Sequence, residues 1–412
     1  MAQPHMTQLD CGATLVVERI PGVRSASTTW LIPCGDAFDD TDRLGCAALL
    51  GEMLVRGAGS LDSRAQADAF DRVGATRGVE NGRIFMRLTS TALGDRLDEA
   101  MRLVAQSVLE PRFDAGSLDS ARDLCLQSLA SLADEPQHRA TLLARARHFA
   151  EPVNRSGYGT EDGLKAVTRD ELADAWAAHA RPKGSIIGVA GDVDTDKVTS
   201  TLNGLLGSWS GEAPWYQGGG APPRGYAHEE DDSSQVQVLL VHESPDAGSA
   251  DNPLERVLTA VLSGGMSGRL FTEVREKRGL CYSVNAGYAA DKTFGTTTAY
   301  VGTTPERAQE AIDVLHGELV AIGRTKPVER EEFSRAVEGL KSRVVFSGES
   351  ASARAGSTAG DIYRLGKPRS LEEIVAQIEA VTLEGLNDYA AGRDLGTFTV
   401  QTLGSASVNP PA

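Results

Sequence analysis

The segment Leu262–Gly287 reads LSGGMSGRLFTEVREKRGLCYSVNAG and carries the most structural information in the chain. Its glycine-rich turn leads into Arg269–Lys277, which predicts a helix. Gly279 follows at the position where helices often end in a left-handed conformation. The next residues, Leu280–Ala289, predict a strand whose alternation places three side chains on one face, those of Tyr282, Val284 and Ala286. The segment therefore predicts a helix, a glycine end and a strand in direct succession.

A chain of 412 residues is too long for one ordinary core and predicts two domains. The clearest break is Gly211–Gly225, GEAPWYQGGGAPPRG. Three glycines followed by two prolines cannot continue a helix or a central strand, so this segment predicts a linker. We therefore expect a first domain over residues 1–210 and a second over residues 226–412.

The two halves show the same order of elements. Each predicts strands first, then paired amphipathic helices, then a returning strand, which is typical of an α+β layer and not of an alternating parallel fold. This order favours duplication of one domain. The expected segments of the first half are Thr14–Val17, Ser27–Ile32, Leu44–Arg56, Leu93–Val108, Ser117–Ala133, Arg139–Phe149 and Gly184–Ala190; those of the second half are Gln235–Val241, Pro253–Ser263, Pro305–Ile322, Glu329–Phe346, Leu371–Ile378 and Gly396–Leu403.

The segment Leu262–Gly287 resembles the second domain of pitrilysin- and insulinase-type (inverzincin) zinc metallopeptidases. In that family an Arg near the helix end and a Tyr seven residues further on line the peptide cleft, and Arg275 and Tyr282 match them. The resemblance implies that Tyr282 donates to the scissile carbonyl and that Arg275 holds a neighbouring backbone carbonyl. Both side chains donate without deprotonation. The alternatives are an ion pair of Arg275 with Glu273 or Glu276, and a half-buried sheet position for Tyr282.

The first half resembles the zinc domain of the same family but lacks its metal ligands. The family helix reads His-x-x-Glu-His, and the matching stretch is Gly45–Gly57. Ala48 and Glu52 stand at the two His positions, Gly51 stands at the general-base Glu position, and Ser128 stands at the third ligand. One carboxylate cannot supply the three protein ligands of a catalytic zinc, so we expect no metal in this chain. Gly51 in mid-helix costs about 1 kcal/mol relative to Ala, which favours a need for a small residue there.

The fold that the resemblance implies is α+β. It consists of two homologous α/β-roll domains, each an antiparallel sheet covered by helices, joined by the linker into half of a clamshell. Two further stretches, residues 159–168 and 186–194, look like the closing segment of the family's first domain.

Other kinds of chemistry find little support in the sequence. The seven histidines include no pair three to five residues apart, although a zinc site assembled from distant residues stays an alternative. The glycine cluster Ser263–Arg269 lacks the spacing of a phosphate loop, and the chain contains no G-x-S-x-G. The net charge of −16 argues against nucleic acid and anionic membranes as partners.

Localisation is predicted from segments that the sequence lacks and from its cysteines. The start of the chain has no basic and apolar signal pattern, and no apolar run is long enough for a membrane helix. Five scattered cysteines without C-x-x-C pairing are typical of reduced thiols. The sequence therefore predicts a soluble cytoplasmic protein.

Two functional hypotheses follow. The first is the zinc-free subunit of a two-chain metalloendopeptidase, a pseudoenzyme when alone, which supplies Arg275 and Tyr282 to short peptides at the zinc site of a His-x-x-Glu-His partner. The second is an inactive structural or peptide-binding scaffold, like the core subunits of respiratory complexes that share this fold. The sequence leaves open whether the chain forms a heterodimer or a homodimer, which peptide is cleaved, and which homologue is the partner.

Overall fold

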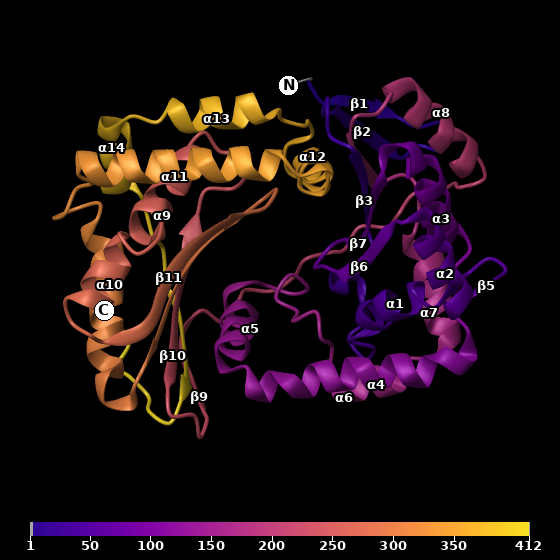
Figure 1. Cartoon of the computed structure of the whole chain (residues 1–412). Helices are drawn as coiled ribbons and strands as arrows, with labels where there is room; N and C mark the ends of the chain where they lie inside the picture. Colours follow the sequence, from indigo (N-terminus) through magenta and orange to yellow (C-terminus); the bar gives the residue numbers. More distant parts are fainter. Residues whose placement is uncertain (1–2, 412) are drawn as a thin grey trace. The chain divides into compact units, whose positions relative to one another are not determined.

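The computed structural model describes residues 3–411, which form two compact units (Figure 1). Unit 1 contains residues 3–131, 151–219 and 347–370, and unit 2 contains residues 132–150, 220–346 and 371–411. The boundary at residues 219 and 220 lies within the segment Gly211–Gly225. Each unit also takes a helix from the other half of the sequence, which the division of the sequence into two halves does not predict.

Unit 1 is a six-stranded sheet in the order β1-β2-β8-β3-β7-β6, with a separate two-stranded ribbon. Strand β8 is parallel to β2 and antiparallel to β3. The strands are β1 His5–Gln8, β2 Thr14–Arg19, β3 Ser25–Ile32, β4 Gly57–Ala58, β5 Leu61–Asp62, β6 Thr76–Asn81, β7 Met86–Leu93 and β8 Ile186–Gly191; the helices are α1 Cys46–Leu54, α2 Ser63–Val73, α3 Leu97–Leu109, α4 Ala115–Ser131, α6 Glu161–Ala166, α7 Arg169–His179, α8 Thr195–Leu206 and α12 Ala351–Leu365.

Unit 2 repeats this arrangement in a five-stranded sheet with the order β11-β12-β10-β13-β9. Strand β13 is parallel to β9 and antiparallel to β10, as β8 is to β2 and β3. The strands are β9 Gly225–Glu230, β10 Val236–Ser244, β11 Cys281–Ala290, β12 Gly295–Thr303 and β13 Thr399–Gly404; the helices are α5 Pro136–His148, α9 Asn252–Ser263, α10 Ala308–Ala321, α11 Arg330–Gly348, α13 Leu371–Glu379, α14 Leu383–Gly392 and the π-helix η4 Phe271–Glu276.

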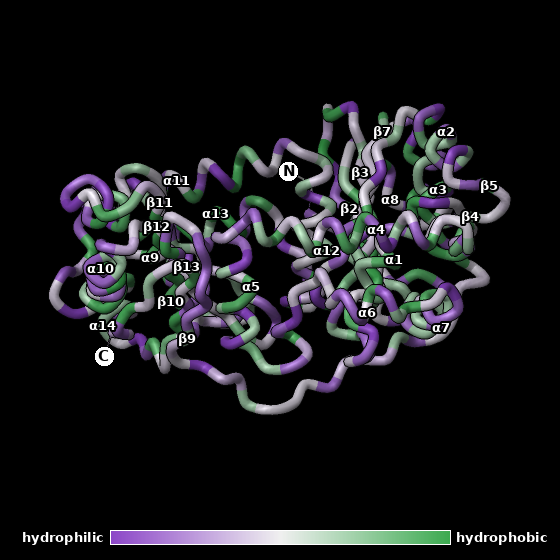
Figure 2. The backbone as a smooth tube through the Cα atoms, turned by 90° about the horizontal axis from the view of Figure 1, so that it is seen from below, coloured by the Kyte–Doolittle hydropathy of each residue, from purple (hydrophilic) through white to green (hydrophobic). Residues whose placement is uncertain are grey.

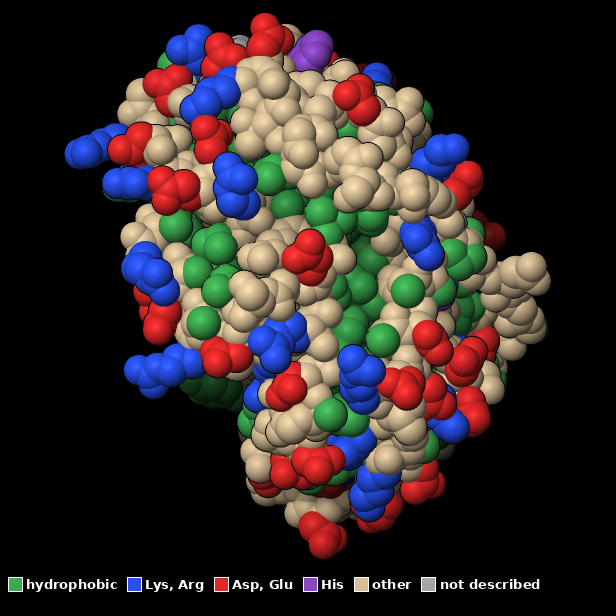
Figure 3. All heavy atoms as spheres, turned by 90° about the vertical axis from the view of Figure 1, so that its right-hand side faces the viewer, with side chains coloured by type: hydrophobic (Ala, Val, Ile, Leu, Met, Phe, Trp, Pro, Cys, Tyr) green, Lys and Arg blue, Asp and Glu red, His purple; other side chains and the backbone are tan. Residues whose placement is uncertain are grey.

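The matching strand orders confirm the predicted α+β class and the duplication. Hydrophobic positions gather on the strands and on the helix faces that meet them (Figure 2). On the face of unit 1 drawn in Figure 3, acidic and basic side chains intermix without a basic patch. No helix within residues 3–411 is long and apolar enough to cross a bilayer.

The exchanged helices α5 and α12 occupy equivalent positions on the two sheets. In unit 2, Ala140 and Ala144 of α5 pack against Leu239 and Val241 of β10. The opposite face of β10 packs against α9 and α10, so both faces of this strand are buried. In unit 1, α12 packs against β2, β3 and β8, and a Cβ at Gly188 of β8 would lie only 2.2 Å from the carbonyl oxygen of Ala355. Small residues therefore allow both helices to approach their sheets closely.

A buried ion pair also fixes α12 to its sheet. The Arg354 guanidinium donates to both carboxylate oxygens of Glu18 on β2, at 2.7 and 3.0 Å, and the two side chains are almost fully buried. Arg354 also donates to the carbonyl of Arg369. Because charges buried at this depth need such partners, the pair couples the placement of α12 to β2.

Candidate functional site

Arg275 and Tyr282 lie side by side at the edge of the unit 2 sheet. The guanidinium carbon of Arg275 lies 4.7 Å from the centre of the Phe271 ring and 5.1 Å from the centre of the Tyr282 ring. Within residues 3–411, neither the guanidinium of Arg275 nor the hydroxyl of Tyr282 has a hydrogen-bond or ion-pair partner. The two aromatic contacts therefore orient the guanidinium while its N–H donors stay free.

The ion pair considered for Arg275 is not formed, because the neighbouring acid has other partners. The Glu273 carboxylate accepts hydrogen bonds from Lys277 at 2.6 Å and from Arg278 at 2.8 Å. The hydrogen bonds from Arg278 and Lys277 lower the pKa of Glu273 to about 2. Glu276, the other acid considered, is exposed.

Tyr282 is not on the same face as Val284 and Ala286, so that part of the strand prediction is wrong. The register between β11 and β12 shifts between Cys281 and Ser283, which makes Tyr282 the extra residue of a β-bulge. A bulge resets the alternation and changes the direction of the side chain at that point. Val284 and Ala286 pack on the core, whereas the Tyr282 side chain is 78% exposed. The half-buried position considered for Tyr282 is likewise wrong.

The helix before the bulge is a π-helix rather than the expected α-helix. The N–H of Lys277 donates to the carbonyl of Thr272, five residues earlier. The wider π turn brings residues four apart closer to one face, and Arg275 stacks on Phe271 at this spacing. The sequence interpretation missed Phe271, although its spacing from Arg275 was a usable signal. Gly279 has a φ of 61°, which confirms the left-handed helix end.

A partly buried ion pair holds the start of this helix. Arg269 donates to both oxygens of Glu332 on α11 at 2.6 Å, and to the carbonyls of Lys326 and Pro327. Burial alone would raise the pKa of Glu332, but the hydrogen bonds from Arg269 and from the Glu329 N–H hold it below its ordinary value. Every donor group of the Arg269 fork thus fixes the segment that presents Arg275.

The degenerate zinc-motif positions lie in unit 1 and carry no metal-binding set. Ala48, Gly51 and Glu52 share the partly exposed face of α1. The Glu52 carboxylate lies 3.5 Å from the guanidinium of Arg56, and Ser128 on α4 is exposed. Within residues 3–411, no group of three or more His, Cys, Asp or Glu side chains is arranged to hold a metal ion. These residues do not fit a catalytic zinc.

Gly51 is not required by close packing, contrary to the interpretation of the sequence. A Cβ at this position would meet Met86 Sδ at 3.7 Å and Val79 Cγ1 at 3.9 Å, which are ordinary van der Waals contacts. Close packing instead requires glycine at Gly45, where a Cβ would come within 2.6 Å of Leu164, and φ there is 113°. The general-base position therefore has room for a Cβ.

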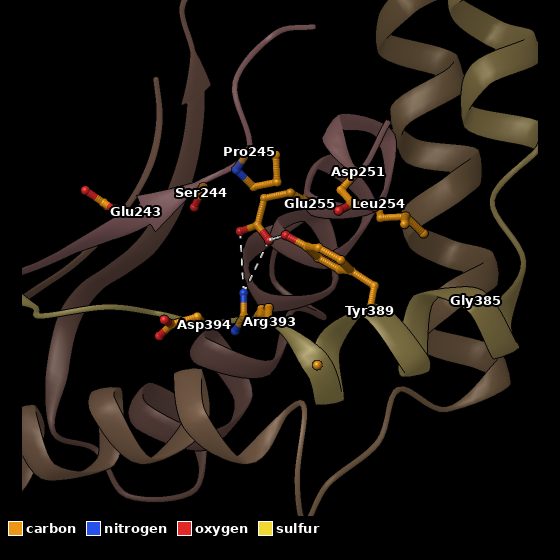
Figure 4. Close-up of a pocket in the computed structure, with 11 residues that line it drawn as sticks. Glu243, Ser244, Pro245, Asp251, Leu254, Glu255, Gly385, Tyr389, Arg393 and Asp394 are labelled. Carbon is orange, nitrogen blue, oxygen red and sulfur yellow. Dashed lines mark hydrogen bonds and ion pairs between the residues drawn. The ribbon is translucent and has the colours of Figure 1, made fainter. Parts of the chain in front are cut away.

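The cavity in Figure 4 belongs to unit 2 and has a volume of about 660 Å³. Glu255 accepts hydrogen bonds from Thr297 at 2.8 Å and Tyr389 at 2.7 Å, and lies 3.3 Å from Arg393. These contacts join α9, β12 and the end of α14, and they pair both oxygens of a carboxylate that is 1% exposed.

This cavity lies at the other end of the sheet from Tyr282. Ser244, the last residue of β10, lines the cavity, whereas the Tyr282 bulge lies level with the first residues of β10. At about 3.4 Å per residue, the two ends are roughly 27 Å apart. The cavity is therefore separate from the Arg275–Tyr282 corner.

Comparisons with known proteins agree with this duplicated fold. The family model described as insulinase (peptidase family M16) matches residues 14–161, and the model described as peptidase M16 inactive domain matches residues 166–340. The chain therefore belongs to peptidase family M16, and the matched inactive-type region contains both Arg275 and Tyr282.

Relatives of similar length carry the name uncharacterized zinc protease. The one from Mycobacterium tuberculosis is 29% identical over 399 residues, which cover 94% of this chain and 90% of the relative. The one from Bacillus subtilis is 25% identical over 383 residues, which cover 92% of this chain and 93% of the relative.

Solved structures share the fold at lower identity. A peptidase M16 inactive domain from Pseudomonas fluorescens superimposes with a TM-score of 0.88 at 21% identity and full coverage of both chains. A chain of complex III2 from Candida albicans superimposes with a TM-score of 0.82 at 15% identity, covering 97% of this chain and 96% of the other.

Proposed function

We propose that this chain is the zinc-free subunit of a two-chain M16 metalloendopeptidase and that Arg275 and Tyr282 bind substrate carbonyls. The observation that carries the proposal is the pair of unengaged donors at one exposed corner, with the guanidinium oriented by two aromatic rings. The partner is a homologous His-x-x-Glu-His subunit that carries the zinc, and the substrate is a short peptide. Alone, this chain does not hydrolyse peptides.

The chemistry of the corner suits a carbonyl that gains negative charge. A guanidinium and a phenol both donate hydrogen bonds without deprotonation, so both can donate in the ground state and in the transition state. A donor aimed at a developing oxyanion contributes roughly 10²–10³ in rate. The names of the M. tuberculosis and B. subtilis relatives support a peptidase context, and the match to an inactive-domain model supports a role without zinc.

The test is to produce this chain together with a His-x-x-Glu-His homologue and to measure cleavage of a quenched fluorescent peptide. We expect Tyr282→Phe to lower kcat roughly 10²–10³-fold without loss of stability, because its hydroxyl has no partner within the described chain. Tyr288→Phe is the matched control on the same strand. Its hydroxyl donates to the Pro245 carbonyl and lies 2.8 Å from Asn252 Nδ2, so this variant should lose about 1 kcal/mol of stability and keep its kcat.

Equal turnover of the Tyr282→Phe pair and the wild-type pair would refute the role of Tyr282. Absence of cleavage by any such pair would instead favour a structural or peptide-binding scaffold. We place the protein in the cytoplasm because its five cysteines are free thiols, which cell fractionation would check.

A further inference from the structure

Unit 2 contains a second cavity, of about 470 Å³, on the face of the sheet covered by α5. Its wall includes Glu135 from the N-terminal end of α5, Gln235 and Gln237 from the start of β10, and Tyr300 from β12. Several polar side chains line the cavity, whereas the neighbouring contacts of α5 with β10 and β13 are apolar.

Gln237 has an unpaired donor in this wall. Its side chain is only 2% exposed, and its Oε1 accepts a hydrogen bond from the Tyr300 hydroxyl at 2.6 Å. Within residues 3–411, its Nε2 has no hydrogen-bond partner. Because Gln237 lines the cavity, its Nε2 is available to an acceptor from outside the chain.

The orientation of the Gln237 amide is fixed by its neighbours. Burial raises the pKa of Tyr300 to about 12, so its hydroxyl stays a donor near neutral pH and holds Oε1. A Cβ at Gly302 would lie 2.5 Å from the Tyr300 hydroxyl and 3.5 Å from Gln237 Oε1. The absence of a side chain at Gly302 therefore gives Tyr300 and Gln237 the room to pair.

The cavity and Tyr282 share one row across the sheet. Gly302 of β12 pairs with Gln237 of β10 on one side and with Ser283 of β11, next to the bulge, on the other. Two strand spacings give about 10 Å between β11 and β10, which an extended peptide covers in about three residues.

The Gln237 amide and the Glu135 carboxylate together favour one class of side chain. Nε2 of Gln237 needs an acceptor, which excludes apolar groups and the cations of Lys and Arg. Glu135 is exposed, and its carboxylate has no partner within the described chain, so it repels acids and accepts from an N–H. A carboxamide supplies both an acceptor and a donor. We propose that this cavity is a substrate subsite for the Gln or Asn side chain of an extended peptide, about three residues from the carbonyl at Tyr282. The proposal rests on the proposed function for its role in cleavage.

The test measures binding of labelled decapeptides to the full chain by fluorescence anisotropy. The three peptides have the same uncharged sequence apart from one central residue, which is Gln, Leu or Glu. We expect the Gln peptide to bind roughly ten-fold more tightly than the Leu peptide, the factor for one further hydrogen bond, and the Glu peptide to bind most weakly.

Three variants identify the source of this preference. Gln237→Leu should abolish the preference for Gln over Leu. Glu135→Gln, at an exposed position whose carboxylate has no partner within residues 3–411, should restore binding of the Glu peptide. Gln401→Leu is the matched control, because Gln401 on β13 is also 2% exposed and its Nε2 donates to the Thr402 carbonyl, so the preference should persist.

Equal binding of the three peptides, or a preference that survives both Gln237→Leu and Glu135→Gln, overturns the subsite. That result leaves the role of Tyr282 in cleavage standing. Conversely, a Gln preference that depends on Gln237 supports the subsite even where Tyr282→Phe leaves turnover unchanged. The two proposals therefore fail separately.

Discussion

Gly51→Ala tests whether packing around α1 requires a glycine at the position that matches the general base. Alanine is favoured over glycine inside a helix by about 1 kcal/mol. The new Cβ would contact Met86 and Val79 at 3.7 and 3.9 Å, distances that add favourable contact without overlap. We therefore expect the free energy of unfolding to rise by about 1 kcal/mol. For a cooperative unit of 150–250 residues this corresponds to roughly 2–4 °C in Tm.

The assay is urea unfolding followed by circular dichroism, with thermal unfolding as a second measurement. Gly188→Ala is the matched control in the same unit. Its Cβ would lie 2.2 Å from the Ala355 carbonyl oxygen, so α12 must move and the variant should be destabilised by roughly 1–3 kcal/mol. Loss of stability in Gly51→Ala would show that the α1 face needs glycine, and the reasoning from the Cβ distances would be refuted.

Two further predictions concern buried polar groups. Burial lowers the pKa of His148 to about 4, so the imidazole is neutral in the folded state and stability falls as pH drops from about 6.5 to 4, by roughly 2 kcal/mol. The His148 Nδ1 lies 2.9 Å from the Thr399 hydroxyl, and His148→Asn, which keeps a hydrogen-bonding group there, should flatten that slope in urea titrations at each pH. Arg354→Met removes the guanidinium that pairs with the buried Glu18 carboxylate and should cost about 3–5 kcal/mol, whereas the double variant with Glu18→Leu should recover most of that loss.

The sequence predicted the elements and their order because hydrophobic period and turn residues report local structure. The left-handed helix end at Gly279 is an example, since glycine there has a conformational reason within a few residues. The same local signals gave the strands that open each half and the helices that follow. Arg275 and Tyr282 were singled out by the resemblance of Leu262–Gly287 to a family motif, and not by these local signals.

The features that escaped prediction depend on contacts distant in sequence. The bulge at Tyr282 exists because β11 and β12 pair out of step, which no period within β11 records. The exchange of α5 and α12 depends on which sheet receives an apolar helix face, and the face itself does not specify that. The sequence did not single out Gln237, because its interest lies in an Nε2 amide group that has no partner within the described residues while Oε1 is paired with Tyr300.

The room at Gly51 bears on why the chemistry would be divided between two chains. A Cβ at Gly51, the position that matches the general base, would make only ordinary contacts, so packing there does not require glycine. At the Arg275–Tyr282 corner, by contrast, several features fix the local structure. The partly buried ion pair at Arg269, a π turn and a bulge together present two donors. Such donors gain their effect only when a carbonyl develops charge beside them. A corner that presents two donors, in a chain without a metal-binding set within residues 3–411, suits the proposed arrangement in which another subunit supplies the metal.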